Sequence, residues 1–201
     1  MKNRLLLFIC IACFAYAGRT QRITYGEPNK DDGRQTNFEI IGRYGSNVLI
    51  YKNVHDHHAI STYDIDMKEV NKVSLDYIPD RVSNVDFISY PTYGWVIYQY
   101  QKKSIVYCMA AKIDDTGKKI GEPILLDTTN ISYNTDNKLY SIINSEDKKH
   151  IMIFKINNKN EKKWIFKTLL FDNEFNNQKT SKFVLPLSNR NDLLTDFLLD
   201  N

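Results

Sequence analysis

The chain has 201 residues, which is enough for one domain of ordinary size. Its 27 basic and 24 acidic side chains nearly balance, with a formal net charge of +3 at pH 7. This balance gives no electrostatic reason to expect nucleic acid or an anionic membrane surface as a partner. The 42% hydrophobic content supports a packed core, and the 12% aromatic share favours strands.

The N-terminus has the three parts of a cleavable secretory signal. Lys2 and Arg4 give a positive start, an apolar run of about ten residues follows, and Ala15 and Ala17 place small side chains where signal peptidase reads them. The run is too short for a spanning helix, which needs about 20 residues. We therefore expect residues 1–17 to be a signal peptide. The mature chain would be exported to a periplasm, a cell surface or the medium, without a transmembrane span.

Two alternatives for this segment are an uncleaved membrane anchor and a lipoprotein modified at Cys13. Cleavage would remove Lys2 and Arg4 and leave 25 basic against 24 acidic side chains, a net charge of +1. Cys108 would then be the only cysteine left, and a lone cysteine cannot form an internal disulfide. Because Cys108 stands in an apolar run, we expect a buried side chain rather than a reactive thiol.

Residues 18–37 are polar and rich in turn residues, which indicates a linker. From Phe38 onward, short runs rich in Val, Ile, Tyr, Phe and Thr recur between turn residues, and each has the length of a strand. The runs fall into three sets at a period of about 50 residues. The first set is 38–42, 47–52, 59–64 and 70–76; the second is 85–90, 95–101, 104–113 and 120–127; the third is 139–144, 150–156, 163–172 and 180–185.

The three sets are similar to one another. An apolar pair occupies matching places in the second strand of each, and an aspartate begins the turn after each third strand. The pairs are Ile50-Tyr51, Ile97-Tyr98 and Ile153-Phe154, and the aspartates are Asp64, Asp114 and Asp172. Four strands per repeat at this period are typical of a β-propeller blade. The sequence predicts an all-β domain over 38–190, with three four-stranded antiparallel propeller-type blades at about 38–79, 85–127 and 139–187.

The turn Asp114–Lys119 lies between a Tyr-rich strand pair and Pro123–Leu126, and it resembles the blade hairpins of β-propeller-like proteins. More narrowly, residues 38–201 resemble uncharacterised exported β-propeller-like repeat proteins of gram-negative bacteria. The resemblance implies an architecture and brings no catalytic residues with it.

Three blades are too few for a closed ring, since propellers use about four to eight. The run Thr195–Leu199 resembles Asn84–Ile88, the opening strand of the second set, so residues 191–201 are interpreted as the start of a further blade. A tail, helical with Asn191 or Asp192 as N-cap, is the alternative. We expect a truncated propeller, a complete protein whose three sheets pack as a partial propeller or sandwich, or a ring closed by oligomerisation.

The densest group of metal-binding side chains is the run His55-Asp56-His57-His58. Alternate residues of a strand share a face, so His55 and His57 are predicted to converge on Zn²⁺ or Cu²⁺. The same run also fits a solvated hairpin turn, since His150 is the only other histidine and no cysteine set completes the ligands.

A second candidate site is the concentration of aromatic residues in the second set. Aromatic faces stack on sugar rings, and the loop Pro91–Gly94 presents Tyr93 beside Trp95. We predict Tyr93 and Trp95 as binding residues. Packing within and between blades is the alternative, because it also uses large aromatic rings.

The sequence contains no G-x-S-x-G, HExxH, P-loop or dinucleotide fingerprint, and no carboxylate pair stands out. Nothing in it calls for a cofactor. We therefore expect a non-catalytic binding or scaffolding protein of the cell envelope, with a protein or a glycan as its partner. The alternative is a partial propeller of a secreted hydrolase that acts on glycans or peptides.

Overall fold

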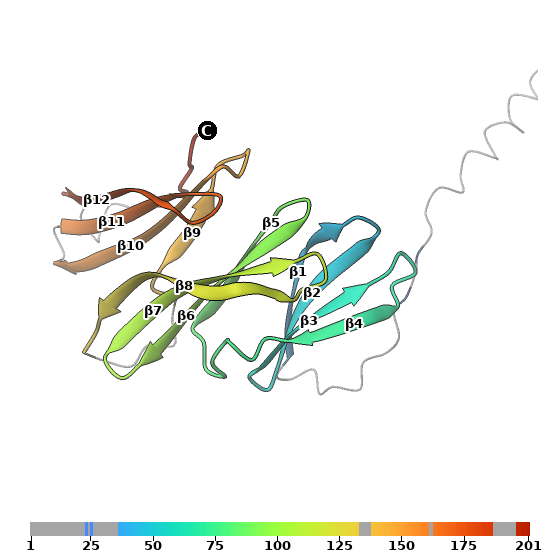
Figure 1. Ribbon diagram of the computed structural model, residues 1–201. Coiled ribbons are helices and arrows are strands. Elements are labelled where there is room, and N and C mark those ends of the chain that lie inside the picture. Colours follow the sequence, from blue (N-terminus) through green and yellow to red (C-terminus); the bar gives the residue numbers. More distant parts are fainter. Residues whose placement is uncertain (1–22, 24, 26–35, 133–137, 161–162, 187–195) are drawn as a thin grey trace, which may run out of the picture.

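The computed structural model describes residues 23, 25, 36–132, 138–160, 163–186 and 196–201, which form three sheets of four strands (Figure 1). Sheet 1 contains β1 (Thr36–Tyr44), β2 (Asn47–Val54), β3 (His57–Tyr63) and β4 (Glu69–Ser74). Sheet 2 contains β5 (Asn84–Ser89), β6 (Tyr93–Lys102), β7 (Ile105–Asp114) and β8 (Lys119–Asn130). Sheet 3 contains β9 (Ser141–Asn144), β10 (His150–Asn160), β11 (Lys163–Asp172) and β12 (Asn177–Leu185).

The prediction of an all-β chain with three four-stranded antiparallel sheets is confirmed. Each predicted run overlaps one strand, and the strands of each sheet are neighbours in chain order, so each sheet is a meander. The three described sheets do not close into a ring. Among the described residues there is no helix that could cross a membrane.

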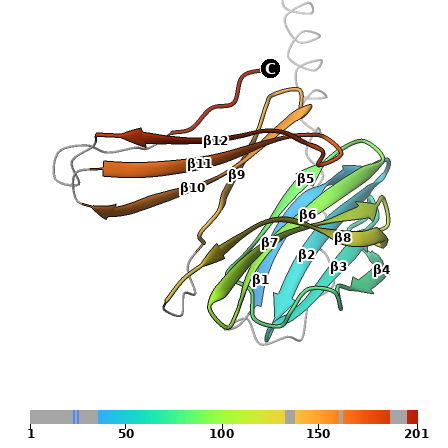
Figure 2. The ribbon, with the colours of Figure 1, turned by 60° about the vertical axis from the view of Figure 1, so that its left-hand side comes forward.

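Two apolar cores join the sheets. Sheets 1 and 2 lie face to face, and sheet 3 extends from sheet 2 with its strands turned steeply relative to theirs (Figures 1 and 2). The core between sheets 1 and 2 includes Leu49, Tyr51, Ile60, Val96 and Ile113. The core between sheets 2 and 3 includes Ile97, Cys108, Tyr140, Ile153 and Phe171. Sheet 2 is therefore covered on both faces, and this explains the run of consecutive buried residues in β6.

Cys108 is fully buried in the core between sheets 2 and 3, as predicted. Burial, with a smaller effect from the negative charge of Asp127, raises the pKa of its thiol to about 12. The side chain therefore stays protonated and acts as a small apolar residue.

The turn after the third strand is the same in all three sheets, as the spacing of its aspartates indicated. The aspartates are Asp64, Asp114 and Asp172. The carboxylate of each accepts hydrogen bonds from the backbone N–H groups two and four residues later. The fourth residue of the turn is left-handed, with φ of 57° at Met67, 85° at Gly117 and 59° at Phe175. Glycine is required at 117, because a Cβ there would lie only 2.7 Å from Cγ2 of Ile60 in sheet 1.

The predicted alignment of the apolar pairs in the second strands was wrong by one residue in sheet 2. Counting back three residues from each turn aspartate and crossing to the paired second strand leads to Ile50, Val96 and Ile153. The matching pair in sheet 2 is therefore Val96-Ile97, and the predicted pair Ile97-Tyr98 is out of register. The difference matters because a shift of one residue moves a side chain to the other face of its sheet.

We call the side of a sheet that is turned toward the next sheet in chain order its forward face. Tyr51 and Ile97 hold equivalent positions on the forward faces of sheets 1 and 2, and Phe154 holds that position in sheet 3.

Residues 196–201 lie against sheet 3 and carry no strand assignment. The ring of Phe197 packs on Phe154, with 4.6 Å between the centroids. Phe87 of β5 packs in the same way on Tyr51, at 5.1 Å. Phe197 thus meets sheet 3 as the first strand of sheet 2 meets sheet 1. The start of a further blade over 191–201 stays a prediction, since residues 187–195 are outside the described part.

The predicted signal peptide over residues 1–17, with Ala15 and Ala17, also lies outside the described residues, as does most of the linker 18–37. The first strand begins at Thr36, two residues before the predicted start of ordered structure.

Candidate functional site

The predicted metal ligands His55 and His57 lie at the β2–β3 hairpin. His55 and Asp56 form its two-residue turn with φ of 52° and 63°, which are typical of a type I′ turn. Both histidines are exposed. In the described part of the chain, no three His, Cys, Asp or Glu residues are grouped so that they could hold a metal ion. Metal binding at His55 and His57 stays a prediction.

His58 has a role that the sequence did not indicate. It is buried, with Nδ1 2.6 Å from the hydroxyl of Tyr51 and Nε2 3.2 Å from the backbone oxygen of Asp80. A neutral imidazole satisfies both contacts when Nδ1 accepts from Tyr51 and Nε2 donates to Asp80. The three residues thereby fix the loop between β4 and β5 against sheet 1.

Trp95 lies in the core between sheets 2 and 3 and is only 3% exposed. Its indole N–H donates to the backbone oxygen of Asn173 at 3.0 Å, and its ring meets Phe175 edge-on at 4.8 Å. The indole therefore joins sheet 2 to the β11–β12 turn.

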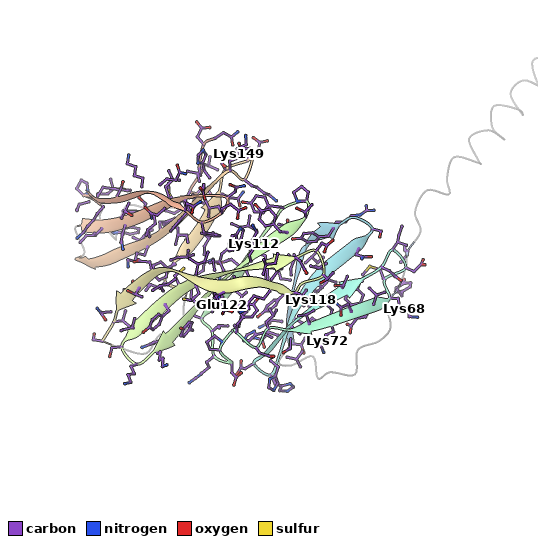
Figure 3. All side chains as sticks on the ribbon, in the orientation of Figure 1. Lys68, Lys72, Lys112, Lys118, Glu122 and Lys149 are labelled. Atoms are coloured by element: carbon purple, nitrogen blue, oxygen red, sulfur yellow. The ribbon has the colours of Figure 1, made fainter. Side chains whose placement is uncertain are left out.

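Tyr93 is half-buried beside Trp95 in β6. Its ring stacks on Tyr90 with 4.6 Å between centroids, and the ammonium group of Lys112 lies 4.1 Å from its centroid. Lys112 also pairs with Glu174 of sheet 3 at 2.6 Å, and Figure 3 shows it at the junction of the two sheets. The binding role of Tyr93 and Trp95 stays a prediction.

A pocket of about 250 Å³ lies where the first strands of sheets 1 and 2 come together. We call it the β1–β5 pocket; it is lined by Asn37, Phe38, Glu39, Tyr51, Asn53 and residues 82–85. Strands β1 and β2 supply one wall, and the end of the loop that His58 anchors supplies the other. Most of the lining residues are polar, although the neighbouring interface between the sheets is apolar.

Two side chains of this pocket stand out. Oδ1 of Asn53 is buried and has no hydrogen-bond partner, which is rare for a buried polar atom. Partial desolvation of the Glu39 carboxyl group raises its pKa, and the nearby charge of Asp86 adds to the rise, while Lys138 acts in the other direction. Lys138 itself donates to both carboxylate oxygens of Asp86, at 2.8 and 3.0 Å.

At the junction of sheets 2 and 3, the position equivalent to Asn53 is held by Gln99, whose side chain is packed between the two sheets. Gln99 lies two residues after Ile97, as Asn53 lies two residues after Tyr51, and it is fully buried. Its Nε2 donates to the backbone oxygen of Tyr140 at 2.7 Å. Its Oε1 accepts from the backbone N–H groups of Leu139 and Tyr140, at 3.1 and 2.8 Å. Asparagine is one methylene shorter than glutamine, and the junction of sheets 1 and 2 keeps an open pocket at this place.

The arrangement is suited to binding a small polar group through hydrogen bonds. Amide, hydroxyl and carboxylate groups line one space, and the buried Oδ1 of Asn53, a lining residue, has no hydrogen-bond partner. Sequence reasoning did not find this site, because its residues are spread over two sheets and none belongs to a motif. Comparisons with protein-family models, with curated proteins and with solved structures find no match to the chain.

Proposed function

We propose that the protein is an exported, non-catalytic binding protein of the cell envelope that holds one sugar unit of a glycan in the β1–β5 pocket. The observation that carries this proposal is the buried, unpartnered Oδ1 of Asn53, a residue that lines a pocket with further amide, hydroxyl and carboxylate groups. A sugar offers donors and acceptors at closely spaced positions, and such groups match this lining.

The size and lining of the pocket support a single sugar unit. A volume of about 250 Å³ is just below the range of roughly 300–1,000 Å³ for drug-sized ligands. Glu39 of β1 pairs with Tyr51 on the forward face of sheet 1, so its carboxyl group is on the pocket side of the sheet.

The place of the pocket in the fold also supports the proposal. Four-stranded meanders in series are compatible with a propeller-type arrangement, here a partial one. In such an arrangement blades surround a central channel, and clefts between structural units are preferred places for ligands. Export is inferred from the predicted signal peptide over residues 1–17.

Binding is tested on the mature protein by nuclear magnetic resonance titration with monosaccharides at millimolar concentration. We expect saturable shifts for residues of β1, β2 and the start of β5. Asn53→Ala should lose the binding, whereas Asn177→Ala, an exposed asparagine in β12, should keep it. Shifts that are absent, or that are unchanged in Asn53→Ala, would refute the proposal.

A further inference from the structure

We infer that the group held at Asn53 is a secondary amide, supplied by the acetamido group of an N-acetylated amino sugar. This inference rests on the proposed function and names the chemistry that the same pocket recognises.

The first step is the contact that the chain makes with itself between sheets 2 and 3. There the side-chain amide of Gln99 pairs in both directions with main-chain amides, donating to the Tyr140 carbonyl and accepting from the N–H groups of Leu139 and Tyr140. A carboxamide therefore recognises secondary amides at this position of the repeat.

The second step is that Asn53 presents the same functional group at the same position. Tyr51 and Asn53 share the forward face of sheet 1, as Ile97 and Gln99 share that of sheet 2. The buried Oδ1 of Asn53 lacks a hydrogen-bond donor, and the N–H of a secondary amide supplies one.

The third step is that the main-chain amides at the start of β5 pair with β6, so they are not available to Asn53. The Ser83 N–H donates to the backbone oxygen of Gln99 at 2.7 Å, and Asn84 stands opposite Gln99 in the β5–β6 ladder. In sheet 3 the ladder starts only at Ser141, so the amides of residues 139 and 140 are available to Gln99. At the β1–β5 pocket an amide from outside the chain takes the place of these internal ones.

The remaining lining fits the rest of an N-acetylated sugar. Val85 and Tyr51 form an apolar part of the wall that suits the acetyl methyl group. Glu39 supplies a carboxyl group for a ring hydroxyl.

The test compares four ligands on the mature protein by calorimetry and by resonance shifts of the Asn53 side-chain amide: N-acetylglucosamine, glucosamine, glucose, and the peptide analogue N-acetylglycine N-methylamide. We expect N-acetylglucosamine to bind roughly tenfold more tightly than glucose or glucosamine, which corresponds to about one buried hydrogen bond. Asn53→Ala should abolish this preference, because it removes the oxygen that accepts from the acetamido N–H, and Asn177→Ala should retain it.

The outcomes separate the two claims. Equal affinity for glucose and N-acetylglucosamine would overturn the amide inference and leave the glycan proposal standing. Binding of the peptide analogue without any sugar would support amide recognition and refute the glycan proposal. No binding by any ligand, with the Asn53 amide resonances unmoved, would overturn both.

Discussion

Replacing Gly117 with alanine tests how closely sheets 1 and 2 approach each other. Gly117 occupies the left-handed position of the β7–β8 turn, and this turn lies on sheet 1 at Ile60. The equivalent positions hold Met67 and Phe175, so the backbone conformation alone does not require glycine. The contact with Ile60 does, because a Cβ at 117 would lie 2.7 Å from its Cγ2 and 3.1 Å from its Cβ.

The expected cost has two parts. A left-handed residue other than glycine costs about 1–2 kcal/mol, and overpacking a close contact costs a further 1–3 kcal/mol or so. Gly117→Ala should therefore lower the free energy of unfolding by about 2–5 kcal/mol. Gly45→Ala is the matched control, since Gly45 has φ of 60° and nothing lies within 4 Å of a Cβ built there. It should show only the first part, about 1–2 kcal/mol.

Urea unfolding, followed by far-ultraviolet circular dichroism and by tryptophan fluorescence, measures both variants against the parent protein. The difference between the variants isolates the contact between the sheets, because the backbone cost is common to both. Equal destabilisation by Gly117→Ala and Gly45→Ala would refute the close packing of the β7–β8 turn on sheet 1.

Two further predictions concern the junction of sheets 2 and 3. Burial acts to raise the pKa of Asp127, but hydrogen bonds and charges from Lys155 and Lys167 hold that pKa below its usual value. The carboxylate therefore stabilises the fold above its unfolded pKa of about 3.9, and this contribution disappears as the pH falls through the lower folded pKa. Urea unfolding should show Asp127→Asn less stable than the parent at pH 7 and nearly equal to it at about pH 2; an equal deficit at both pH values would contradict the ion pairs. Gln99→Asn should cost about 1–3 kcal/mol, since buried main-chain N–H groups lose their acceptor, and an unchanged urea midpoint would show that Gln99 does not hold this junction.

The strands and their turns could be predicted because their signals are local. Runs of β-branched and aromatic residues mark the strands, and Asp64, Asp114 and Asp172 mark one repeated turn whose hydrogen bonds span only five residues. It was harder to predict which side chains lie on the forward face of a sheet and which lie on the opposite face. Ile97-Tyr98 looks like Ile50-Tyr51 in sequence, yet only the pairing of β6 with β7 reveals the one-residue shift between them.

The candidate site could not be predicted for a related reason. Asn53 and Gln99 are unremarkable polar residues in apolar strands, and their equivalence appears only after the register is known. The open pocket beside Asn53 depends further on how the chain enters β5, a contact between residues about 30 positions apart. For Trp95, an aromatic residue next to a loop suggested a binding surface, whereas its ring lies in the core against the β11–β12 turn.

The sharing of sheet 2 between both cores has a consequence for how the molecule folds and opens. Each sheet is a meander of consecutive strands, so pairing within a sheet joins residues close in sequence and is expected to form quickly. Packing between sheets follows a nearest-neighbour pattern, as in linear repeat proteins. Loss of sheet 1 or sheet 3 leaves one core intact, whereas loss of sheet 2 removes both. Backbone amides of β6 and β7 should therefore exchange with solvent most slowly, and opening should proceed from the two outer sheets inward.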